Sequence, residues 1–154
     1  MICQAIAERP AISGETFIEA GCWQGGSSAR FSIICNMLNY SLCIYGSFEG
    51  VEPMSPEDKA ESYDFSGEYA SPGSILHKNL ALYSEPNVCT IHKGWFVDTL
   101  AKGAVPYKVR LAFIDCDLAK GTREVLTGIV PALTDQYFGH FLSERAEQTK
   151  SRTG

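Results

Sequence analysis

The fold is decided by Thr16-Phe17-Ile18-Glu19-Ala20-Gly21-Cys22-Trp23-Gln24-Gly25-Gly26-Ser27-Ser28-Ala29. An apolar run ends at an acid and a glycine, and two further glycines and two serines then open a second apolar stretch. This order is typical of a β-strand, a tight turn and the start of a helix. Glycines let the backbone approach a ligand closely, and the N–H groups at a helix start point outward. Many α/β proteins use the same pattern only to turn the chain, so a binding turn and a structural turn both stay open here.

The rest of the chain alternates helical and strand patterns. A helix is expected to run to about Asn39, capped by Ser27 or Ser28, because apolar residues recur at helical spacing at Phe31, Ile34, Cys35 and Leu38. A second helix is expected from Ser74, with Ile75, Leu76, Leu80 and Tyr83 packed on the sheet, and a third around 125–133, ending or kinking at Pro131. Strands are expected at 42–45, 88–91 and 109–114. Strands that alternate with helices predict an α/β fold with a mostly parallel sheet.

Composition narrows the function. The chain has 154 residues, 45% of them hydrophobic, which suits one folded domain with a core. A formal net charge of −5 and the lack of a basic cluster before the tail argue against nucleic acid and anionic membranes as partners. No apolar run is long enough to span a bilayer, and the N-terminus lacks a basic signal region, so we expect a cytoplasmic protein. The six cysteines show no C-x-x-C pair and are expected to be reduced core residues.

Polar and aromatic residues follow three of the expected strands. Acids at Asp115 and Asp117 come directly after the strand at 109–114, where open α/β sheets bind ligands. Such a pair could hold a hard cation and leave one carboxylate as a base, or it could be only a loop with a helix cap. Gly94 and Trp95 follow the third strand and would suit an adenine platform, although the indole could instead plug the base of the sheet. Glu49 follows the second strand and could accept hydrogen bonds from a ribose or only stabilise its turn.

Four stretches are spelled in a more specific way. They are Phe17-Ile18-Glu19-x-Gly21-x-Trp23-x-Gly25-Gly26-Ser27, Ser47-Phe48-Glu49-Gly50, Lys93-Gly94-Trp95-Phe96-x-Asp98-Thr99-Leu100 and Asp115-Cys116-Asp117-Leu118. Together they resemble the macrocin O-methyltransferase (TylF-like) family, which are S-adenosylmethionine-dependent, metal-assisted sugar O-methyltransferases. The spacing of Gly21 and Gly25 does not suit the G-x-G-x-x-G dinucleotide fingerprint, which argues against a nicotinamide enzyme.

The resemblance implies a Rossmann-like class I methyltransferase core, here shortened to about four mostly parallel strands flanked by helices. It implies O-methylation of a hydroxyl on a sugar or glycosylated small molecule, with S-adenosylmethionine as cofactor and Mg²⁺ as an aid. Asp115 would be the metal ligand and a catalytic residue, and Asp117 the general base. The residues implied for cofactor binding are Glu19, Gly21, Cys22, Gly25, Ser28, Glu49, Gly94 and Trp95.

Three departures from the family pattern leave a second function open. Gly46 replaces the family's ribose-binding aspartate, and Lys120 stands close to the expected cation site. After Leu133 the family would supply a fifth strand and an Asp-Asp pair, but only 21 residues follow. The resemblance therefore covers about residues 16–133, and the alternative is a truncated or divergent module that binds the cofactor or a protein partner without catalysis.

The ends of the expected domain carry further predictions. We expect one shortened domain over residues 1–143 and a polar, mobile tail over 144–154. The strand at 109–114 is too apolar for an open edge. Residues 136–142 could replace the missing strand, but Gly139 weakens them as a strand, so self-association into a homo-oligomer is the favoured remedy. Residues 51–73 lack a steady period and contain three prolines, which favours a functional lid, with a disordered excursion as the alternative.

Overall fold

A four-stranded parallel sheet forms the centre of the molecule, seen in a computed structural model that describes residues 14–61 and 63–134. Its strands are β1 (Glu15–Ala20), β2 (Ser41–Gly46), β3 (Cys89–Lys93) and β4 (Lys108–Ile114). They lie in the order β3-β2-β1-β4, and each neighbouring pair is parallel. The prediction of an α/β fold with four mostly parallel strands is confirmed.

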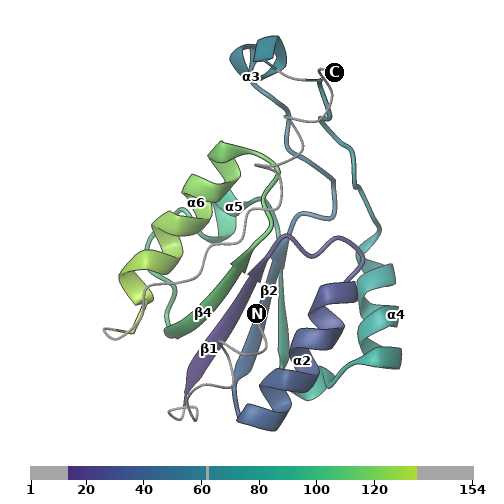
Figure 1. Ribbon diagram of the computed structural model, residues 1–154, viewed down its shortest axis with the longest axis vertical. Helices are drawn as coiled ribbons and strands as arrows, with labels where there is room; N and C mark the ends of the chain where they lie inside the picture. The colour runs from purple at the N-terminus through teal and green to yellow at the C-terminus, as the bar shows by residue number, and fades with distance from the viewer. Residues whose placement is uncertain (1–13, 62, 135–154) are drawn as a thin grey trace, which may run out of the picture.

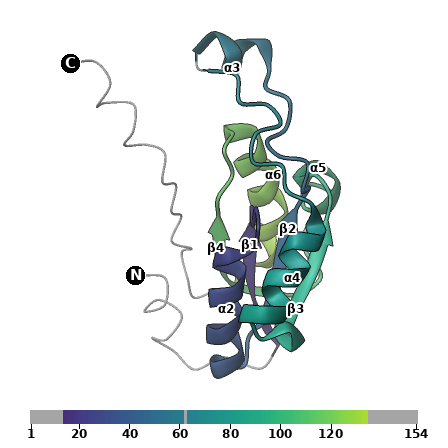
Figure 2. The ribbon, with the colours of Figure 1, turned by 90° about the vertical axis from the view of Figure 1, so that its right-hand side faces the viewer.

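Helices cover both faces of this sheet (Figure 1). One face carries α2 (Gly26–Leu38) and α4 (Gly73–Tyr83), and the other carries α5 (Phe96–Thr99) and α6 (Ala119–Ile129). Short 3-10 turns precede β3 at Pro86–Val88 and follow α6 at Val130–Ala132, where Pro131 ends the helix as expected. Figure 2 shows the same sandwich of layers from the side.

The hydrophobic core has one layer on each side of the sheet. β1 is buried along its whole length because it lies between two strands and under helices on both faces. Phe17 packs edge-on against Phe31 of α2, with ring centroids 4.9 Å apart, and Ile18 faces the α6 layer. One expected core contact is absent, because the Tyr83 side chain is 66% exposed at the end of α4 while Leu76 and Leu80 are buried.

The order of the strands places a binding position at the top of the sheet. From β1 the chain moves outward through β2 to β3, and it then crosses back over β1 to add β4 on the other side. Loops that leave β1 and β4 therefore part in opposite directions at their C-terminal ends. Ligands of open α/β sheets bind in the crevice that forms at such a switch point.

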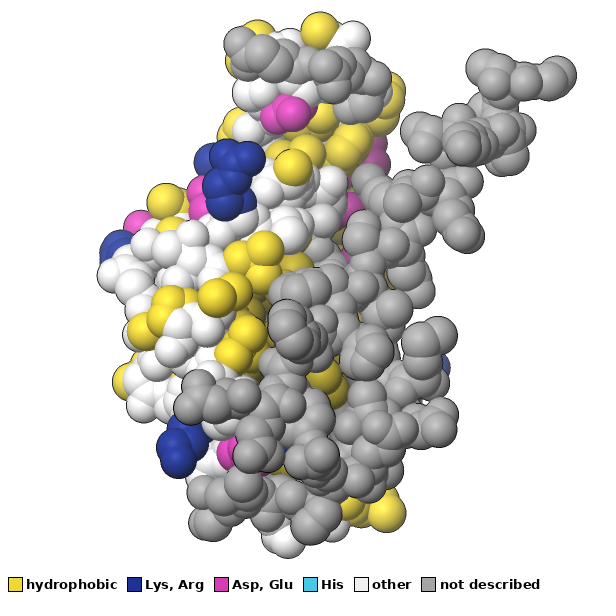
Figure 3. Space-filling view, turned by 60° about the vertical axis from the view of Figure 1, so that its left-hand side comes forward, with side chains coloured by type: hydrophobic (Ala, Val, Ile, Leu, Met, Phe, Trp, Pro, Cys, Tyr) yellow, Lys and Arg dark blue, Asp and Glu magenta, His cyan; other side chains and the backbone are white. Residues whose placement is uncertain are grey.

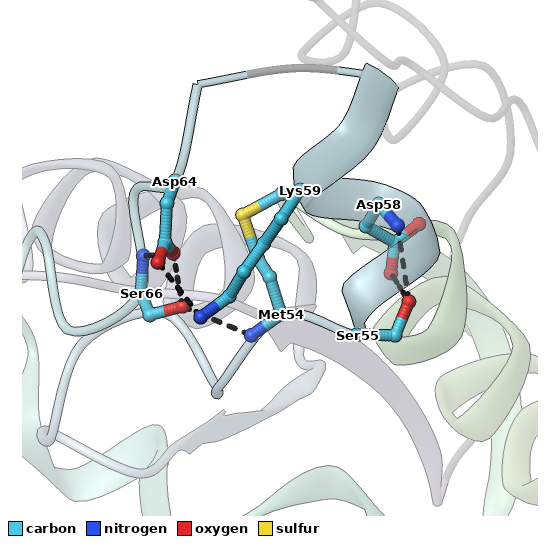
Figure 4. A network of polar contacts seen from close by, with 6 residues as sticks. All are labelled: Met54, Ser55, Asp58, Lys59, Asp64 and Ser66. Carbon is cyan, nitrogen blue, oxygen red and sulfur yellow. Dashed lines mark hydrogen bonds and ion pairs between the residues drawn. The ribbon is translucent and has the colours of Figure 1, made fainter.

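The excursion between β2 and α4 stands away from the sheet and carries the short helix α3 (Pro56–Glu61) at its tip (Figure 1). Its two limbs are joined at the base, where Val51 N–H donates to the Glu68 carbonyl (2.9 Å) and Gly67 N–H to the Val51 carbonyl (2.8 Å). At its tip Lys59 pairs with Asp64 (2.8 Å), and Ser66 accepts from the Met54 N–H (2.9 Å), as Figure 4 shows. The excursion thus has its own hydrogen-bonded structure.

The outer edge of β4 receives the chain again at the end of the described part. Leu133 forms a single parallel bridge with Val109, and Thr134 N–H donates to the Val109 carbonyl (3.2 Å). The expected replacement strand at 136–142 and the expected tail at 144–154 lie outside the described residues. Figure 3, turned so that the α6 side comes forward, shows hydrophobic side chains that reach the border of the grey atoms.

Within residues 14–61 and 63–134, every helix is too short or too polar to cross a bilayer.

Candidate active site

A cleft of about 540 Å³ opens over the C-terminal ends of the strands, at the switch point. Its volume falls in the range of small-molecule sites. The loops after all four strands and the base of the excursion form its walls. The site residues expected from the sequence that line it are Gly21, Cys22, Gly94, Trp95, Asp115 and Asp117. Glu19, Gly25, Ser28 and Glu49 do not line it.

Glu19 supports the turn after β1 from below the cleft. Its side chain is fully buried and accepts hydrogen bonds from the Ser27 hydroxyl and, at 2.5 Å, from the Ser28 hydroxyl. Burial raises the pKa of Glu19 to about 7, the two serine hydroxyls oppose this shift, and the negative charge of Asp115 adds to it. Glu19 therefore ties the end of β1 to the first turn of α2.

The serines have a different role from the predicted cap. Gly25 occupies the N-cap position of α2, in left-handed conformation and without a side-chain cap, while both serine hydroxyls turn to Glu19. The first N–H groups of a helix have no partner inside the helix. At α2 they lie at the floor of the cleft, beside Gly26 and Ser27, which line it.

The glycines of the turn are needed for different reasons. A Cβ on Gly21 would lie 2.2 Å from the backbone oxygen of Asp115, so this glycine allows the turn to pack against the end of β4. A Cβ on Gly25 would lie 2.2 Å from Leu76 Cδ1 of α4. A Cβ on Gly26 would meet nothing within 4 Å, although Gly26 lines the cleft. Only at Gly26 does the missing side chain leave space for a ligand alone.

The ends of β2 and β3 form the far wall. Gly46 follows β2 with its α-carbon close to Cys22, since an added Cβ would lie 3.1 Å from the sulfur. Glu49 is exposed outside the cleft, and its N–H donates to Ser47 Oγ (3.1 Å), which fits the turn-stabilising alternative. After β3, Gly94 and half-buried Trp95 line the cleft, whereas Asp98 lies outside it and pairs with Lys102 at 3.5 Å.

The end of β4 forms an acidic wall. Asp115 and Asp117 line the cleft together with Glu52 of the excursion and Glu124 of α6. Burial and then the charges of these four carboxylates raise the pKa of the Cys116 thiol to about 12, which shows that they surround it. Lys120 bridges Glu52 (2.5 Å) and Glu124 (3.7 Å) and so joins the excursion to α6.

The expected metal site is incomplete in the described part of the chain. No group of three or more His, Cys, Asp or Glu side chains there could hold a metal ion. Mg²⁺ prefers about six oxygen ligands in octahedral geometry, and Asp115 and Asp117 alone supply too few. These residues do not fit a resident Mg²⁺ ion.

The comparison with known families now has a structural context. The model of the family described as "Macrocin-O-methyltransferase (TylF)" matches residues 2–138. The chain belongs to the macrocin O-methyltransferase family. Its motif at Asp115-Cys116-Asp117 and its motif at Gly94-Trp95 meet across one cleft, as expected if they serve one site.

Solved structures share the fold of this family member. One is titled "Structure of the O-methyltransferase NovP", with a TM-score of 0.65, 22% identity, and coverage of 79% of this chain and 53% of that chain. Another is titled "Crystal Structure of CalS11, Calicheamicin Methyltransferase", with a TM-score of 0.61, 16% identity, and coverage of 90% and 59%. The chain thus spans little more than half the length of either protein. No curated protein matches it.

Several residues of the cleft were missed from the sequence of this macrocin O-methyltransferase family member. They are Phe48, Glu52, Tyr69, Ser71 and Glu124. Only Phe48 carried a signal, because it belongs to the Ser47–Gly50 motif. The others come from the excursion, which has no periodic pattern, and from the side of α6 that turns to the cleft.

The buried Glu19 predicts a pH-dependent stability. An unfolded glutamic acid loses its proton near pH 4.3, whereas Glu19 keeps it in the fold to about pH 7. The folded state binds more protons within this window, so the free energy of unfolding should fall as the pH rises from about 4.3 to 7 and then level off, by about 3 kcal/mol from this group. Urea unfolding of the chain and of Glu19→Gln at pH 5 and pH 8 measures it. The loss should be clearly smaller in Glu19→Gln, and equal losses would contradict the assignment.

Proposed function

We propose that the chain is an S-adenosylmethionine-dependent O-methyltransferase that acts on a hydroxyl of a sugar or glycosylated small molecule. The observation that carries this proposal is the meeting of Asp115 and Asp117 with the glycine-rich turn at the switch point of the sheet. Membership in the macrocin O-methyltransferase family supports the reaction type.

The cofactor would lie across the ends of β1, β2 and β3. Open space at Gly26 and the N-terminus of α2 suit the polar amino-acid end of S-adenosylmethionine. Trp95 offers a flat ring, and Gly94 beside it has no side chain to block the approach of an adenine. Glu19, Gly25 and Ser28 would act indirectly, by holding the turn in place, and Cys22 would contact the cofactor from the end of β1.

The chemistry asked of the protein is alignment and removal of a proton. S-adenosylmethionine supplies a methyl group already activated on a sulfonium. The acceptor oxygen forms a bond to this carbon as the carbon–sulfur bond breaks, and the hydroxyl proton passes to a carboxylate. Asp117, half-buried at the end of β4, is the proposed base. Asp115, next to the turn, would orient the acceptor.

No step is routed through a metal, because the described carboxylates do not form a cage for one. The implied role of Asp115 as a Mg²⁺ ligand stays a prediction. Titration with Mg²⁺ in the presence and absence of an acceptor measures whether the ion binds.

The alternative is a module that binds the cofactor or a protein partner without catalysis. Gly46 in place of the ribose-binding aspartate favours it. The test is transfer of a labelled methyl group from S-adenosylmethionine to a panel of glycosides. Transfer supports the enzyme, whereas cofactor binding without transfer to any glycoside supports the alternative. We also infer action in the cytoplasm, because the described cysteines are free thiols.

Self-association is proposed for the edge of β4. Within the described residues this edge has one bridge, at Val109, while Leu111 and Phe113 farther along are only partly buried. An apolar edge of this kind favours pairing with a second copy. Sedimentation velocity at micromolar concentration should show a homo-oligomer, and Arg110→Pro, which removes an edge N–H, should dissociate it. A monomer at all concentrations would contradict the proposal.

A further inference from the structure

Strained backbone conformations gather at the cleft. Four non-glycine residues in the described part of the chain have positive φ: Trp23 (42°), Asn39 (58°), Phe48 (66°) and Tyr69 (61°). Asn39 ends α2, where asparagine commonly adopts this conformation. The other three are aromatic, for which positive φ is costly, and all three line the cleft. Strain of this kind is retained mainly at ligand sites.

Two of these aromatic rings form one exposed surface. Trp23 comes from the turn after β1 and Tyr69 from the returning limb of the excursion, and their rings meet edge-to-face at a centroid distance of 6.4 Å. The residues are 56% and 50% exposed. Packing in the core therefore does not explain why these large rings are held here.

A buried polar group next to this surface lacks a partner. Ser71 is 3% exposed and lines the cleft, and its hydroxyl has no hydrogen-bond partner in the described structure. An unsatisfied buried hydroxyl is costly unless a ligand completes it. This observation is independent of the aromatic rings and points to a polar ligand.

The cleft is also one-sided in charge. Its lining includes Glu52, Asp115, Asp117 and Glu124 but, among the described residues, no lysine, arginine or histidine. Lys120 neutralises part of this charge through Glu52 and Glu124. An acceptor that carries phosphate groups would be repelled, whereas hydroxyl groups can donate hydrogen bonds to carboxylates.

We propose that Trp23 and Tyr69 form the stacking subsite for the acceptor, a glycoside without phosphate groups. One face of a sugar ring exposes C–H groups, which suit an aromatic surface, while its hydroxyls would reach Ser71 and the acidic wall. This proposal rests on the proposed function for the identity of the donor, but it assigns two residues and a charge class that the reaction alone does not specify. Because Tyr69 belongs to the excursion, the excursion would select the acceptor.

The test measures glycoside binding by saturation-transfer NMR, with and without bound S-adenosylhomocysteine. The probes are methyl glycosides of glucose, rhamnose and galactose, with uridine diphosphate glucose as the phosphorylated counterpart. At least one methyl glycoside should bind, with saturation strongest on the protons of one ring face. Tyr69→Ala and Trp23→Ala should each weaken its binding about tenfold. Tyr69→Phe, which keeps the ring, should retain it.

The controls separate this proposal from its neighbours. Tyr63→Ala removes an exposed tyrosine of the same excursion that is not in the cleft lining, and it should leave glycoside binding unchanged. S-adenosylhomocysteine affinity should be the same in all variants. Glycoside binding that does not depend on Trp23 and Tyr69, no binding by any methyl glycoside, or tighter binding of uridine diphosphate glucose would overturn the proposal. Loss of S-adenosylhomocysteine binding in Tyr69→Ala would also overturn it, since the rings would then hold the cofactor. If the wild-type chain binds glycosides but not S-adenosylhomocysteine, the proposed function fails and the subsite stands.

Discussion

Replacing Asp117 with asparagine should lower the rate of methyl transfer by at least about 100-fold, the usual contribution of a general base. The change removes the ability to accept a proton but keeps the size of the side chain. Affinity for S-adenosylmethionine should stay close to that of the parent chain, because a base is not a binding contact. Initial rates at saturating acceptor, together with calorimetric cofactor titration, measure the two quantities separately.

Asp98→Asn is the matched control for this experiment. Asp98 lies on α5 outside the cleft and is exposed, so its loss of charge should leave the rate unchanged. Equal losses of rate and of cofactor affinity in Asp117→Asn would indicate a structural aspartate and contradict its role as a base.

Gly21→Ala should destabilise the fold by about 2 kcal/mol or more, the combined effect of overpacking and of a left-handed backbone. Gly21 has a φ of +90°, and an added Cβ would lie 2.2 Å from the Asp115 backbone oxygen, which cannot move away without shifting the end of β4. Urea unfolding followed by circular dichroism measures the change. Gly26→Ala, where the Cβ meets nothing, is the control and should have little effect. Similar midpoints for both variants would show that the turn does not pack on β4 as described.

This contrast shows what sequence patterns could and could not predict. The strand, turn and helix at residues 16–39 follow from local spacing and were expected within one or two residues of their observed bounds. The reason for Gly21 was not accessible, because its neighbour Asp115 comes from a distant strand. The sequence suggested that Gly21 makes room for a cofactor, whereas the structure shows that it makes room for β4.

The candidate site divides in the same way. Gly94, Trp95, Asp115 and Asp117 were found because each follows a recognisable strand, and parallel strands bring their C-terminal ends to one edge. Tyr69, Ser71 and Glu52 were missed, because the excursion reaches the cleft only through hydrogen bonds between its two limbs at Val51. Ser27 and Ser28 were assigned as caps since their positions suit one, but the buried Glu19 competes for their hydroxyls.

The central claim is that the cleft beside the glycine-rich turn binds S-adenosylmethionine. Calorimetric titration of the chain and of Gly26→Val with S-adenosylmethionine tests it most directly. The valine side chain would enter the cleft, where the backbone now leaves open space, without a clash in the fold. The account predicts binding of one cofactor per chain and a clear loss of affinity in Gly26→Val at unchanged thermal stability. Absence of binding by the parent chain, or equal affinity in a folded Gly26→Val, would contradict it.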